Sequence, residues 1–377
     1  MIYLDHGATS HPKPESVYRA ADEALRAGGN PGRGGHRLAL AAGRRVMAAR
    51  EAVAAFFGLA DSSRVVFTAS ATDSLNLALK GLLRPGDHVI TTRAEHNALR
   101  RPLAALERQG VAVTWLPVCP EGFLNPLDLR AALRPETRLI GIHHGSNVTG
   151  AIQPVADVAE IARRHGALLL VDAAQTAGSH AIHMERKGID LLAAPGHKGL
   201  LGPQGSGLLL AAPGVDLTPV REGGTGSQSA AAEQPRTFPE GFESGTLNVP
   251  AIAGLAAGLA FLTEQGPARG EGERTRALAE GLRAIPGVRV YGPKDPASRC
   301  AVVCFSIEGL DPGEVEERLD EEYGVLGRAG LHCNPGAHEA MGTLAVGGAM
   351  RLSPGWATTE ADVEAAVRAV AALARQR

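Results

Sequence analysis

The sequence predicts an α/β protein with a mainly parallel, doubly wound sheet in a large domain and a second, smaller α+β domain. From about residue 40 to residue 212, helical and strand patterns alternate, which is typical of a parallel sheet covered by helices. Beyond residue 250 the alternation gives way to short strands mixed with long helices. A chain of 377 residues is long enough for two domains. We therefore predict a large domain over 16–250 and a smaller one over 1–15 and 251–377.

Each element is predicted from its apolar periodicity and its length. Alanine-rich or amphipathic segments predict helices in the large domain over 39–57, 71–82, 99–109, 127–133 and 155–165. Short apolar runs predict strands over 64–68, 87–91, 112–116, 137–143 and 167–172. The same patterns predict helices over 250–264, 312–322 and 360–375, and strands over 288–290, 300–307 and 349–352. Ligands of doubly wound sheets bind at the carboxyl ends of the strands, so the candidate site residues are sought there.

Composition excludes several classes of function. The apolar fraction is 44%, the charged fraction 21% and the net charge −2, so we expect neither nucleic acid nor an anionic membrane as a partner. The N-terminus has no basic flank or apolar signal core, and we expect a cytoplasmic protein. The four cysteines form no CxxC pair, and His143 with His144 are not spaced for a metal, so we predict no metal site.

Asp172 and Lys198 are the most informative pair. Asp172 ends the apolar run 167–172, and Lys198 follows the next apolar run, which breaks at Pro195. A strand-end acid beside a lysine on the neighbouring strand end is what pyridoxal 5'-phosphate (PLP) requires. The lysine forms a Schiff base, and the acid keeps the pyridine nitrogen protonated, so that the ring acts as an electron sink. A lysine after a strand is, taken alone, more often a solvated surface residue.

Other strand ends carry residues that suit such a cofactor. Ala71 and Thr72 open a helix, whose N-terminal amides favour a phosphate, although such a segment is, taken alone, more often an ordinary Ser/Thr-capped helix. His96 follows a strand and suits stacking on a ring, or else capping a helix. Asn147 suits an amide contact to a ring oxygen, or else a turn. Cys333 lies in a predicted loop, where its thiol is accessible.

Taken together, these segments resemble the class V aminotransferase-type, fold-type I PLP enzymes, and specifically the cysteine desulfurases. The motifs occur in family order along nearly the whole chain: Tyr3-Leu-Asp-His-Gly-Ala-Thr9, Asn30-Pro31, His36, Ala71-Thr72, Glu95-His96-Asn97, Ser146-Asn147-Val-Thr-Gly150, Val171-Asp172-Ala-Ala-Gln175, Gly196-His197-Lys198, Glu243-Ser-Gly-Thr246, Arg328-Ala-Gly-Leu-His-Cys333 and Met350-Arg351-Leu-Ser353. The segment ending at Cys333 resembles the SufS-like and selenocysteine-lyase-like branch.

The resemblance implies a role for each matching residue. Lys198 carries the cofactor, His96 stacks on the ring, and Ala174 packs on the opposite face. Asp172 pairs with the ring nitrogen, and Gln175 with the ring oxygen, close to Asn147. The phosphate is bound by Ala71, Thr72 and His197, and by Thr246 of a partner subunit. Arg351 binds the substrate carboxylate with its two-pronged guanidinium group, and Cys333 accepts sulfur.

The implied activity converts L-cysteine to L-alanine, with the sulfur passing to Cys333 as a persulfide. The resemblance also implies a homodimer, and it allows for a sulfur-acceptor protein as a further partner. Two enzyme alternatives are a selenocysteine lyase and a class V aminotransferase. An alternative that is not an enzyme is a catalytically quiet PLP carrier or sulfur-relay protein. Three residues depart from the family pattern: Pro195 replaces a frequent serine, Asn334 a common alanine, and Trp356 lies where a Tyr-Asn-Thr pattern is usual.

Overall fold

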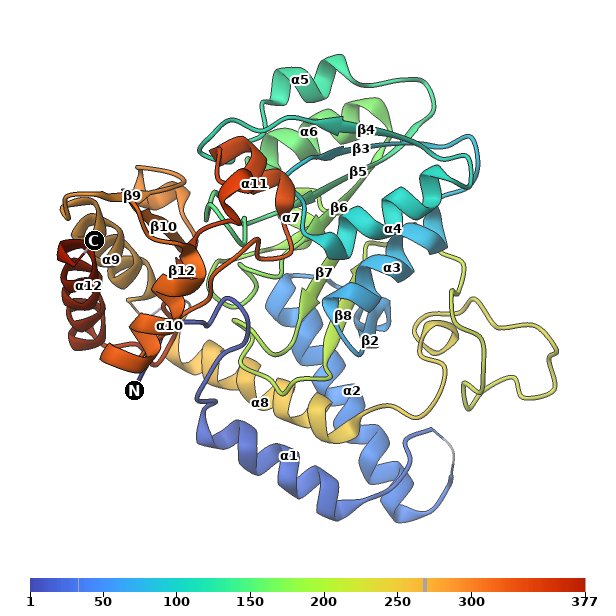
Figure 1. Cartoon of the computed structure of the whole chain (residues 1–377). Helices are drawn as coiled ribbons and strands as arrows, with labels where there is room; N and C mark the ends of the chain where they lie inside the picture. The colour runs from blue at the N-terminus through green and yellow to red at the C-terminus, as the bar shows by residue number, and fades with distance from the viewer. Residues whose placement is uncertain (33, 267–269, 377) are drawn as a thin grey trace.

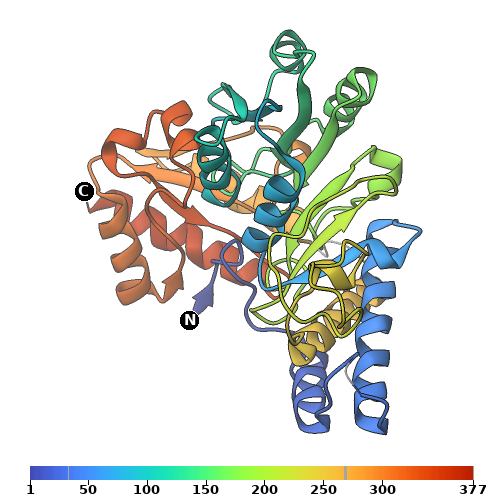
Figure 2. The same ribbon diagram turned by 90° about the vertical axis from the view of Figure 1, so that its right-hand side faces the viewer.

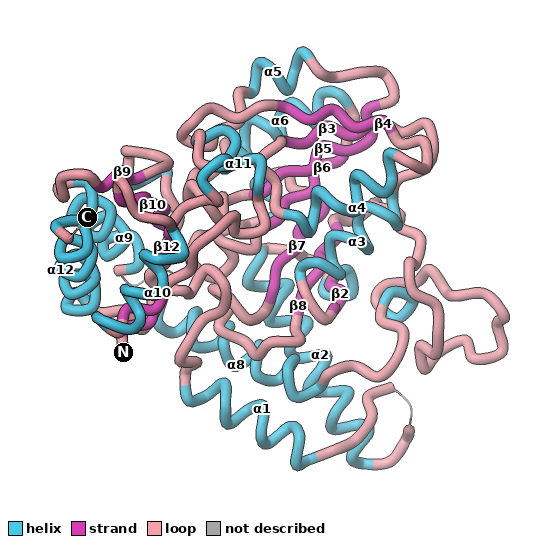
Figure 3. Tube along the Cα trace, viewed as in Figure 1, coloured by secondary structure: helices cyan, strands magenta, loops and turns pink. Residues whose placement is uncertain are grey.

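The computed structural model describes residues 1–32, 34–266 and 270–376. Over these residues a seven-stranded sheet has the order β2-β8-β7-β6-β5-β3-β4 and forms the centre of the larger part (Figure 1; strands in Figure 3). Its strands are β2 (Val65–Thr68), β3 (His88–Thr92), β4 (Ala112–Leu116), β5 (Thr137–His143), β6 (Leu168–Asp172), β7 (Leu191–Pro195) and β8 (Gly207–Ala211). Strand β8 runs antiparallel to both of its neighbours, whereas β4, β3, β5, β6 and β7 pair in parallel. The predicted α/β class with a mainly parallel sheet is confirmed.

Helices cover both faces of this sheet. They are α1 (Glu15–Ala27), α2 (Arg37–Phe57), α3 (Ala71–Leu82), α4 (Asn97–Glu107), α5 (Pro126–Ala131), α6 (Val155–His165), α7 (Met184–Lys187) and α8 (Val249–Gln265). Because side chains alternate along a strand, Val171 of β6 packs with α2, α6 and α8, while its neighbour Leu170 packs with α3 and α4. Strands β7 and β8 are buried on both faces, which explains their continuous apolar runs, whereas the edge strand β4 is only partly buried.

The smaller part contains a three-stranded antiparallel sheet in the order β12-β10-β9 and a short parallel pair, β1-β11. Its elements are β1 (Ile2–Tyr3), α9 (Glu271–Arg283), β9 (Val288–Val290), β10 (Val303–Ile307), α10 (Pro312–Tyr323), β11 (Val325–Leu326), α11 (Pro335–Met341), β12 (Met350–Leu352) and α12 (Glu360–Arg375). Leu4 belongs to the same hydrophobic cluster as α9, α10 and α12, so the N-terminal residues pack with the C-terminal third. Both termini accordingly lie in this part (Figures 1 and 2).

Helix α8 packs differently from what the predicted boundary near residue 250 implies. That boundary assigns α8 to the smaller domain, whereas Ile252, Leu255 and Leu259 lie in the same cluster as the large sheet. The helix runs beside α1 and α2 at the base of the larger part (Figure 1). By packing, α8 therefore belongs with the large sheet, while the division of the chain into two domains stays a prediction.

A buried ion pair fixes edge strand β2 to its surroundings. Arg50 of α2 and Glu243 are 5% and 6% exposed, and their side chains meet in a two-pronged contact, with Nη1–Oε1 and Nη2–Oε2 both 2.8 Å. Glu243 Oε1 also accepts a hydrogen bond from Phe67 N at 2.6 Å. The pair thereby holds the strand that leads into α3 and the turn that precedes Thr246.

We expect Glu243→Ala to destabilise the fold strongly, because it leaves the buried Arg50 cation without its partner. Breaking a buried pair on one side typically costs about 3–5 kcal/mol of unfolding free energy. Asp22→Ala is the matched control, since it removes an exposed ion pair with Arg26 on α1 and should leave stability nearly unchanged. Chemical denaturation of both variants measures the difference, and equal small losses would contradict the role given to the Arg50–Glu243 pair.

Candidate active site

A pocket lies at the carboxyl ends of the parallel strands, where the candidate residues were expected. Loops after β2, β3, β5, β6 and β7 each contribute side chains to it. The lining consists of Ser70, Ala71, Thr72, His96, Ala98, His143, Gly145, Asn147, Asp172, Ala174, Gln175, Pro195, His197 and Lys198. Strand order thus brings together residues that lie more than a hundred positions apart in the sequence.

Lys198 and Asp172 come from adjacent strands. Strand β6 ends at Asp172, its parallel neighbour β7 ends at Pro195, and Lys198 follows in the next turn. Burial, followed by the nearby Arg351 cation, lowers the pKa of Lys198 to about 8, against the opposing effect of Asp172. Burial raises the pKa of Asp172, although the N–H of Ala174 donates to Asp172 Oδ1 at 2.9 Å and offsets part of that effect. An amine and a carboxylate with shifted pKa values in one pocket mark a candidate chemical centre.

The N-terminus of α3 supplies donors at the other end of the pocket. Ser70 caps the helix through a hydrogen bond from Asp73 N at 3.2 Å, and Ala71 and Thr72 form its first turn. Amides of a first turn have no partner within the helix and favour an anion. His197 lies in the same lining, and Pro195, with neither N–H nor hydroxyl, adds no donor.

Lys13 supports this end of the site and was not predicted from the sequence. Its Nζ donates to the backbone oxygen of His197 at 2.7 Å and to Ser10 Oγ at 2.6 Å. Burial lowers the pKa of Lys13 to about 8. Burial, with Lys198 and Lys13 nearby, lowers the pKa of His197 to about 4, so its ring is neutral at pH 7. Its Nδ1 lies 3.1 Å from Thr9 Oγ1, which leaves Nε2 available to a ligand.

His96 caps a helix and also lines the pocket, while its stacking on a cofactor ring stays a prediction. Its Nδ1 accepts a hydrogen bond from Ala98 N at 3.0 Å, so the ring caps α4. The same ring lines the pocket. Burial and the nearby Lys198 lower its pKa to about 4. The neutral ring accepts at Nδ1 and therefore carries its proton on Nε2.

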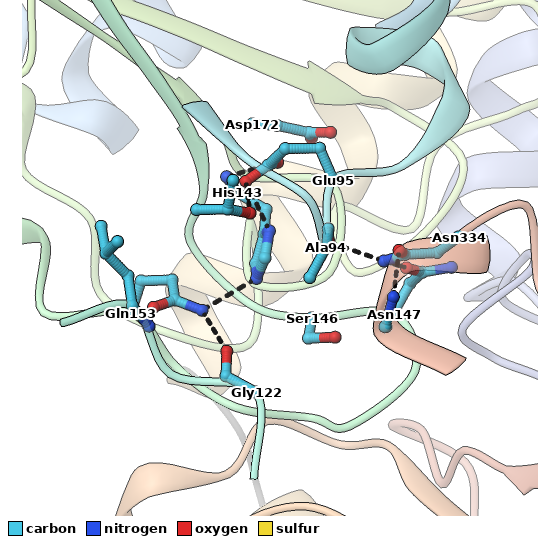
Figure 4. A network of polar contacts seen from close by, with 12 residues as sticks. Ala94, Glu95, Gly122, His143, Ser146, Asn147, Gln153, Asp172 and Asn334 are labelled. Atoms are coloured by element: carbon cyan, nitrogen blue, oxygen red, sulfur yellow. Dashed lines mark hydrogen bonds and ion pairs between the residues drawn. The ribbon is translucent and has the colours of Figure 1, made fainter. Parts of the chain in front are cut away.

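A buried polar network lies beside Asp172 and was missed from the sequence (Figure 4). His143 is the register partner of Asp172 on β5, so the two side chains project to the same face of the sheet. Glu95, fully buried, accepts from His143 N at 2.9 Å, and its Oε1 lies 3.0 Å from His143 Nδ1, an ion-pair distance. On the other side, His143 Nε2 lies 3.0 Å from Gln153 Nε2. The sequence analysis considered His143 only as a metal ligand and gave it no role, whereas the structure places it in the pocket lining.

The network acts on the charge of His143. Burial alone lowers the pKa of His143, but the Glu95 and Asp172 carboxylates outweigh burial and raise it above its usual value. His143 in turn lowers the pKa of the Asp172 carboxylate, against the effect of burial. The sequence contains one signal for this network, namely polar residues close to strand ends. These are Glu95, directly before His96, and His143, at the end of β5.

Arg351 reaches the site from β12 of the smaller part. It is 1% exposed, and its Nη2 lies 2.6 Å from Asp5 Oδ1, while Nη1 donates to the backbone oxygen of Asn147 at 3.2 Å. Within the described part of the chain, Arg351 Nε has no hydrogen-bond partner. Asp5, 346 positions away, was not given a role from the sequence. The guanidinium group therefore retains donor capacity for a further carboxylate.

Cys333 and Thr246 lie outside the pocket lining. Cys333 is exposed in the loop between β11 and α11, and Arg328 Nη2 lies 3.9 Å from its sulfur. Its backbone oxygen accepts from Asn97 N at 2.8 Å, which joins the loop to the start of α4 beside His96. Thr246 is exposed on the single chain, so its expected contact with a partner subunit's phosphate site stays a prediction.

The remaining expectations concern metals, membranes and the departures from the family pattern. Among the residues described, no cluster of acidic, histidine and cysteine side chains is arranged to hold a metal ion. None of the described helices is both long and apolar enough to cross a membrane. Trp356 Nε1 donates to Pro12 O at 2.8 Å, and its ring meets Phe261 of α8 edge-to-face. Trp356, one of the residues that depart from the family pattern, thus packs the smaller part against the larger one.

Comparisons with known proteins identify the family of this chain. The family model of class-V aminotransferases matches residues 2–366. A probable cysteine desulfurase of Methanothermobacter thermautotrophicus is 34% identical over 373 residues, covering 96% of this chain and 92% of that protein. A cysteine desulfurase IscS of an Anaeromyxobacter species is 37% identical over 290 residues, covering 75% of this chain and 67% of that protein. The apo structure of a cysteine desulfurase from Thermococcus onnurineus superposes with a TM-score of 0.93 at 31% identity, covering 100% of this chain and 95% of that one.

These similarities extend over nearly the whole chain and include both its parts. They confirm the predicted fold type, since the similar solved structures are cysteine desulfurases with the same arrangement of elements. The chain belongs to the class-V aminotransferase family, within its group of cysteine desulfurases.

Proposed function

We propose that this protein is a PLP-dependent cysteine desulfurase. The observation that carries the proposal is the meeting of Lys198, Asp172 and the N-terminus of α3 in one pocket, with Arg351 and the Cys333 loop bordering it. The donor set fits the cofactor: an amine for its aldehyde, a carboxylate for its ring nitrogen and helix amides for its phosphate. When bound, PLP supplies an electron sink that weakens the bonds to the substrate Cα.

Lys198 holds the cofactor and then moves a proton at the substrate Cα. A pKa of about 8 leaves a useful fraction of the amine neutral near pH 7, as a nucleophile and a general base must be. Asp172, compensated by His143 and by the N–H of Ala174, holds the ring nitrogen in its protonated form. His96 and Ala174 would pack on opposite faces of the cofactor ring, and Gln175 and Asn147 would bind its oxygen, since all four residues line the pocket.

Arg351 orients the substrate by binding its carboxylate. A two-pronged contact between guanidinium and carboxylate fixes direction as well as distance. Asp5 Oδ1 holds Arg351 Nη2 at 2.6 Å, and Arg351 Nε has no hydrogen-bond partner among the described residues. The substrate amine and β-carbon are thereby directed toward Lys198 and the Cys333 loop.

Cys333 completes the reaction as the sulfur acceptor. Its thiolate attacks the substrate sulfur, the substrate Cβ–S bond breaks, and a new S–S bond forms on Cys333. The electron pair of the broken bond stays on Cβ, which takes up a proton, so that L-alanine leaves. L-Cysteine plus the Cys333 thiol thus gives L-alanine plus the Cys333 persulfide, and the atoms balance without a further oxidant.

The assembly belongs to the same proposal. We propose a homodimer in which Thr246 of each subunit adds a phosphate donor to the site of the other. The exposed position of Thr246, in the turn held by the Arg50–Glu243 pair, supports this arrangement. The exposed Cys333 supports delivery of the sulfur to an acceptor protein or to a small thiol.

Borohydride reduction tests the assignment of Lys198. Peptide mapping of the reduced wild-type protein should find the pyridoxyl group on Lys198, and Lys198→Ala should carry no label. Lys13→Met is the matched control, because Lys13 is also partly buried beside the site with a lowered pKa. That variant should still be labelled on Lys198. A label found on Lys13 would show that the central assignment is wrong.

The pH dependence of cofactor loading tests the environment of Lys198. Only the neutral amine attacks the aldehyde, and lowering the pKa from 10.5 to about 8 shifts that form to lower pH. The rate at which the cofactor-free protein takes up PLP should therefore rise with pH and level off just above pH 8. Stopped-flow absorbance measures this rate. A rate that continues to rise toward pH 10.5 would indicate a lysine of ordinary pKa.

Cys333→Ala separates the desulfurase from the aminotransferase. The variant should still change the cofactor spectrum when L-cysteine is added, because binding depends on Lys198 and Arg351. Alanine formation should fall by at least about 100-fold, since the nucleophile is gone. Cys119→Ala, which removes the other exposed thiol, should stay fully active. Full activity of Cys333→Ala on L-cysteine would exclude the persulfide role, and full activity on selenocysteine alone would favour the selenocysteine lyase.

A further inference from the structure

Asn334, which directly follows Cys333, makes three hydrogen bonds although it departs from the family pattern. It is 1% exposed. Its Oδ1 accepts from Ala337 N at 3.2 Å and so caps α11. Its Nδ2 donates to the backbone oxygen of Ala94 at 2.7 Å and to Asn147 Oδ1 at 3.0 Å (Figure 4). An alanine at this position would provide none of these three contacts.

The contact with Asn147 joins the Cys333 loop to the cofactor pocket. Asn147 lines the pocket, and its Nδ2 donates to the backbone oxygen of His332 at 2.6 Å. Both ends of the Asn147 amide therefore hold residues that flank Cys333 in the sequence. One proton of Asn147 Nδ2 remains for a ligand in the pocket. The backbone oxygen of Asn147 in turn accepts from Arg351, so one residue touches the pocket, the loop and Arg351.

The backbone of the loop explains why such a clamp is needed. His332 and Cys333 have φ angles of 51° and 57°, in the left-handed region that residues other than glycine rarely adopt. Such residues persist only where their surroundings hold them. The carbonyl oxygen of His332 accepts from the pocket residue Asn147, and that of Cys333 accepts from Asn97 N at the start of α4. Asn334 anchors the next residue to the same wall through Ala94.

We propose that Asn334 is a positioning residue, which clamps the Cys333 loop to Asn147 and so presents the thiol to the cofactor pocket in a fixed geometry. The proposal rests on the proposed role of Cys333 as sulfur acceptor. It differs from a mere helix cap, because the cap uses Oδ1, whereas the clamp uses the Nδ2 donor. The two roles can therefore be separated by a side chain that still accepts the hydrogen bond from Ala337 N but is too short to donate to Ala94 O and Asn147 Oδ1.

Asn334→Ser separates them. Serine is a good helix cap, so α11 keeps its N-terminal acceptor, but the amide donor to Ala94 O and Asn147 Oδ1 is lost. Asn125→Ser is the matched control, since the exposed Asn125 caps α5 in the same way through a hydrogen bond from Leu127 N at 3.0 Å. Asn334→Ala and Asn125→Ala form a second pair, in which both variants lose a cap and only the first loses the clamp.

Two readouts are taken for each variant. Amide hydrogen exchange over residues 328–334 is measured on the protein as purified, without substrate, and kcat and KM for L-cysteine follow alanine formation. In Asn334→Ser we expect exchange in this segment to rise about tenfold or more, while exchange in β6 stays unchanged. We expect kcat to fall about tenfold or more, because a small misplacement of the thiol is costly, and KM to change less than threefold. The Asn125 variants should match the wild type in both readouts.

Three results would overturn the proposal. If Asn334→Ser behaves as the wild type, and only Asn334→Ala is impaired, then Asn334 is a helix cap alone. If kcat falls without faster exchange over 328–334, Asn334 does not act through the loop. If Asn334→Ala and Asn125→Ala change equally in both readouts, loss of a cap explains the effect. Full activity of Cys333→Ala would instead disprove the proposed function, while the exchange comparison would still decide the clamp.

Discussion

The burial of the Asp172 carboxylate is the constraint on which the arrangement of this site depends. A charge that is 4% exposed at the end of a strand is stable only beside compensating groups. The structure provides them from three directions: the Ala174 N–H, the Lys198 amine and His143, which Glu95 supports from behind. The parallel pairing of β5, β6 and β7 is what brings these groups to one edge of the sheet.

Charged groups from the two parts of the molecule meet at the site. Arg351 and Lys198 repel each other, and their proximity, after burial, keeps the pKa of the lysine low. Asp5 stabilises the Arg351 cation from the N-terminal segment, and that segment packs with the C-terminal third. In the proposed function, the smaller part contributes the group that binds the substrate carboxylate, and the larger part contributes the groups that hold the cofactor. Asn147 connects the two through its backbone oxygen and its side-chain amide.

The elements with a strong local pattern were predictable from the sequence. The helices over 71–82 and 155–165 and the strands over 112–116 and 137–143 have the predicted bounds. Helices α1, α9 and α11 and the antiparallel strand β8 were not predicted. The predicted strand over 300–307 begins only at Val303, because Cys300 N bonds to Gly150 O outside the sheet. Strand direction depends on pairing with distant residues, which apolar periodicity does not encode.

The site residues also fall into those that have a local sequence signal and those that do not. Lys198, Asp172 and the start of α3 carry local signals, a strand end or a helix start, so the sequence pointed to them directly. The contacts of Asp5 with Arg351 and of Asn334 with Asn147 join residues far apart in the chain, and no local pattern reveals them. Resemblance to a family does not reveal Asn334 either, because alanine is common there in the family.

The proposed transfer of sulfur to Cys333 is tested most directly by following the sulfur atom through a single turnover. Loaded protein is mixed with less than one equivalent of L-cysteine without reductant, and its peptides are then mapped by mass spectrometry. We expect one extra sulfur atom on the peptide that contains Cys333, in the same amount as the alanine released. Alanine released with the sulfur free in solution, or with the extra sulfur on the exposed Cys119, would contradict it.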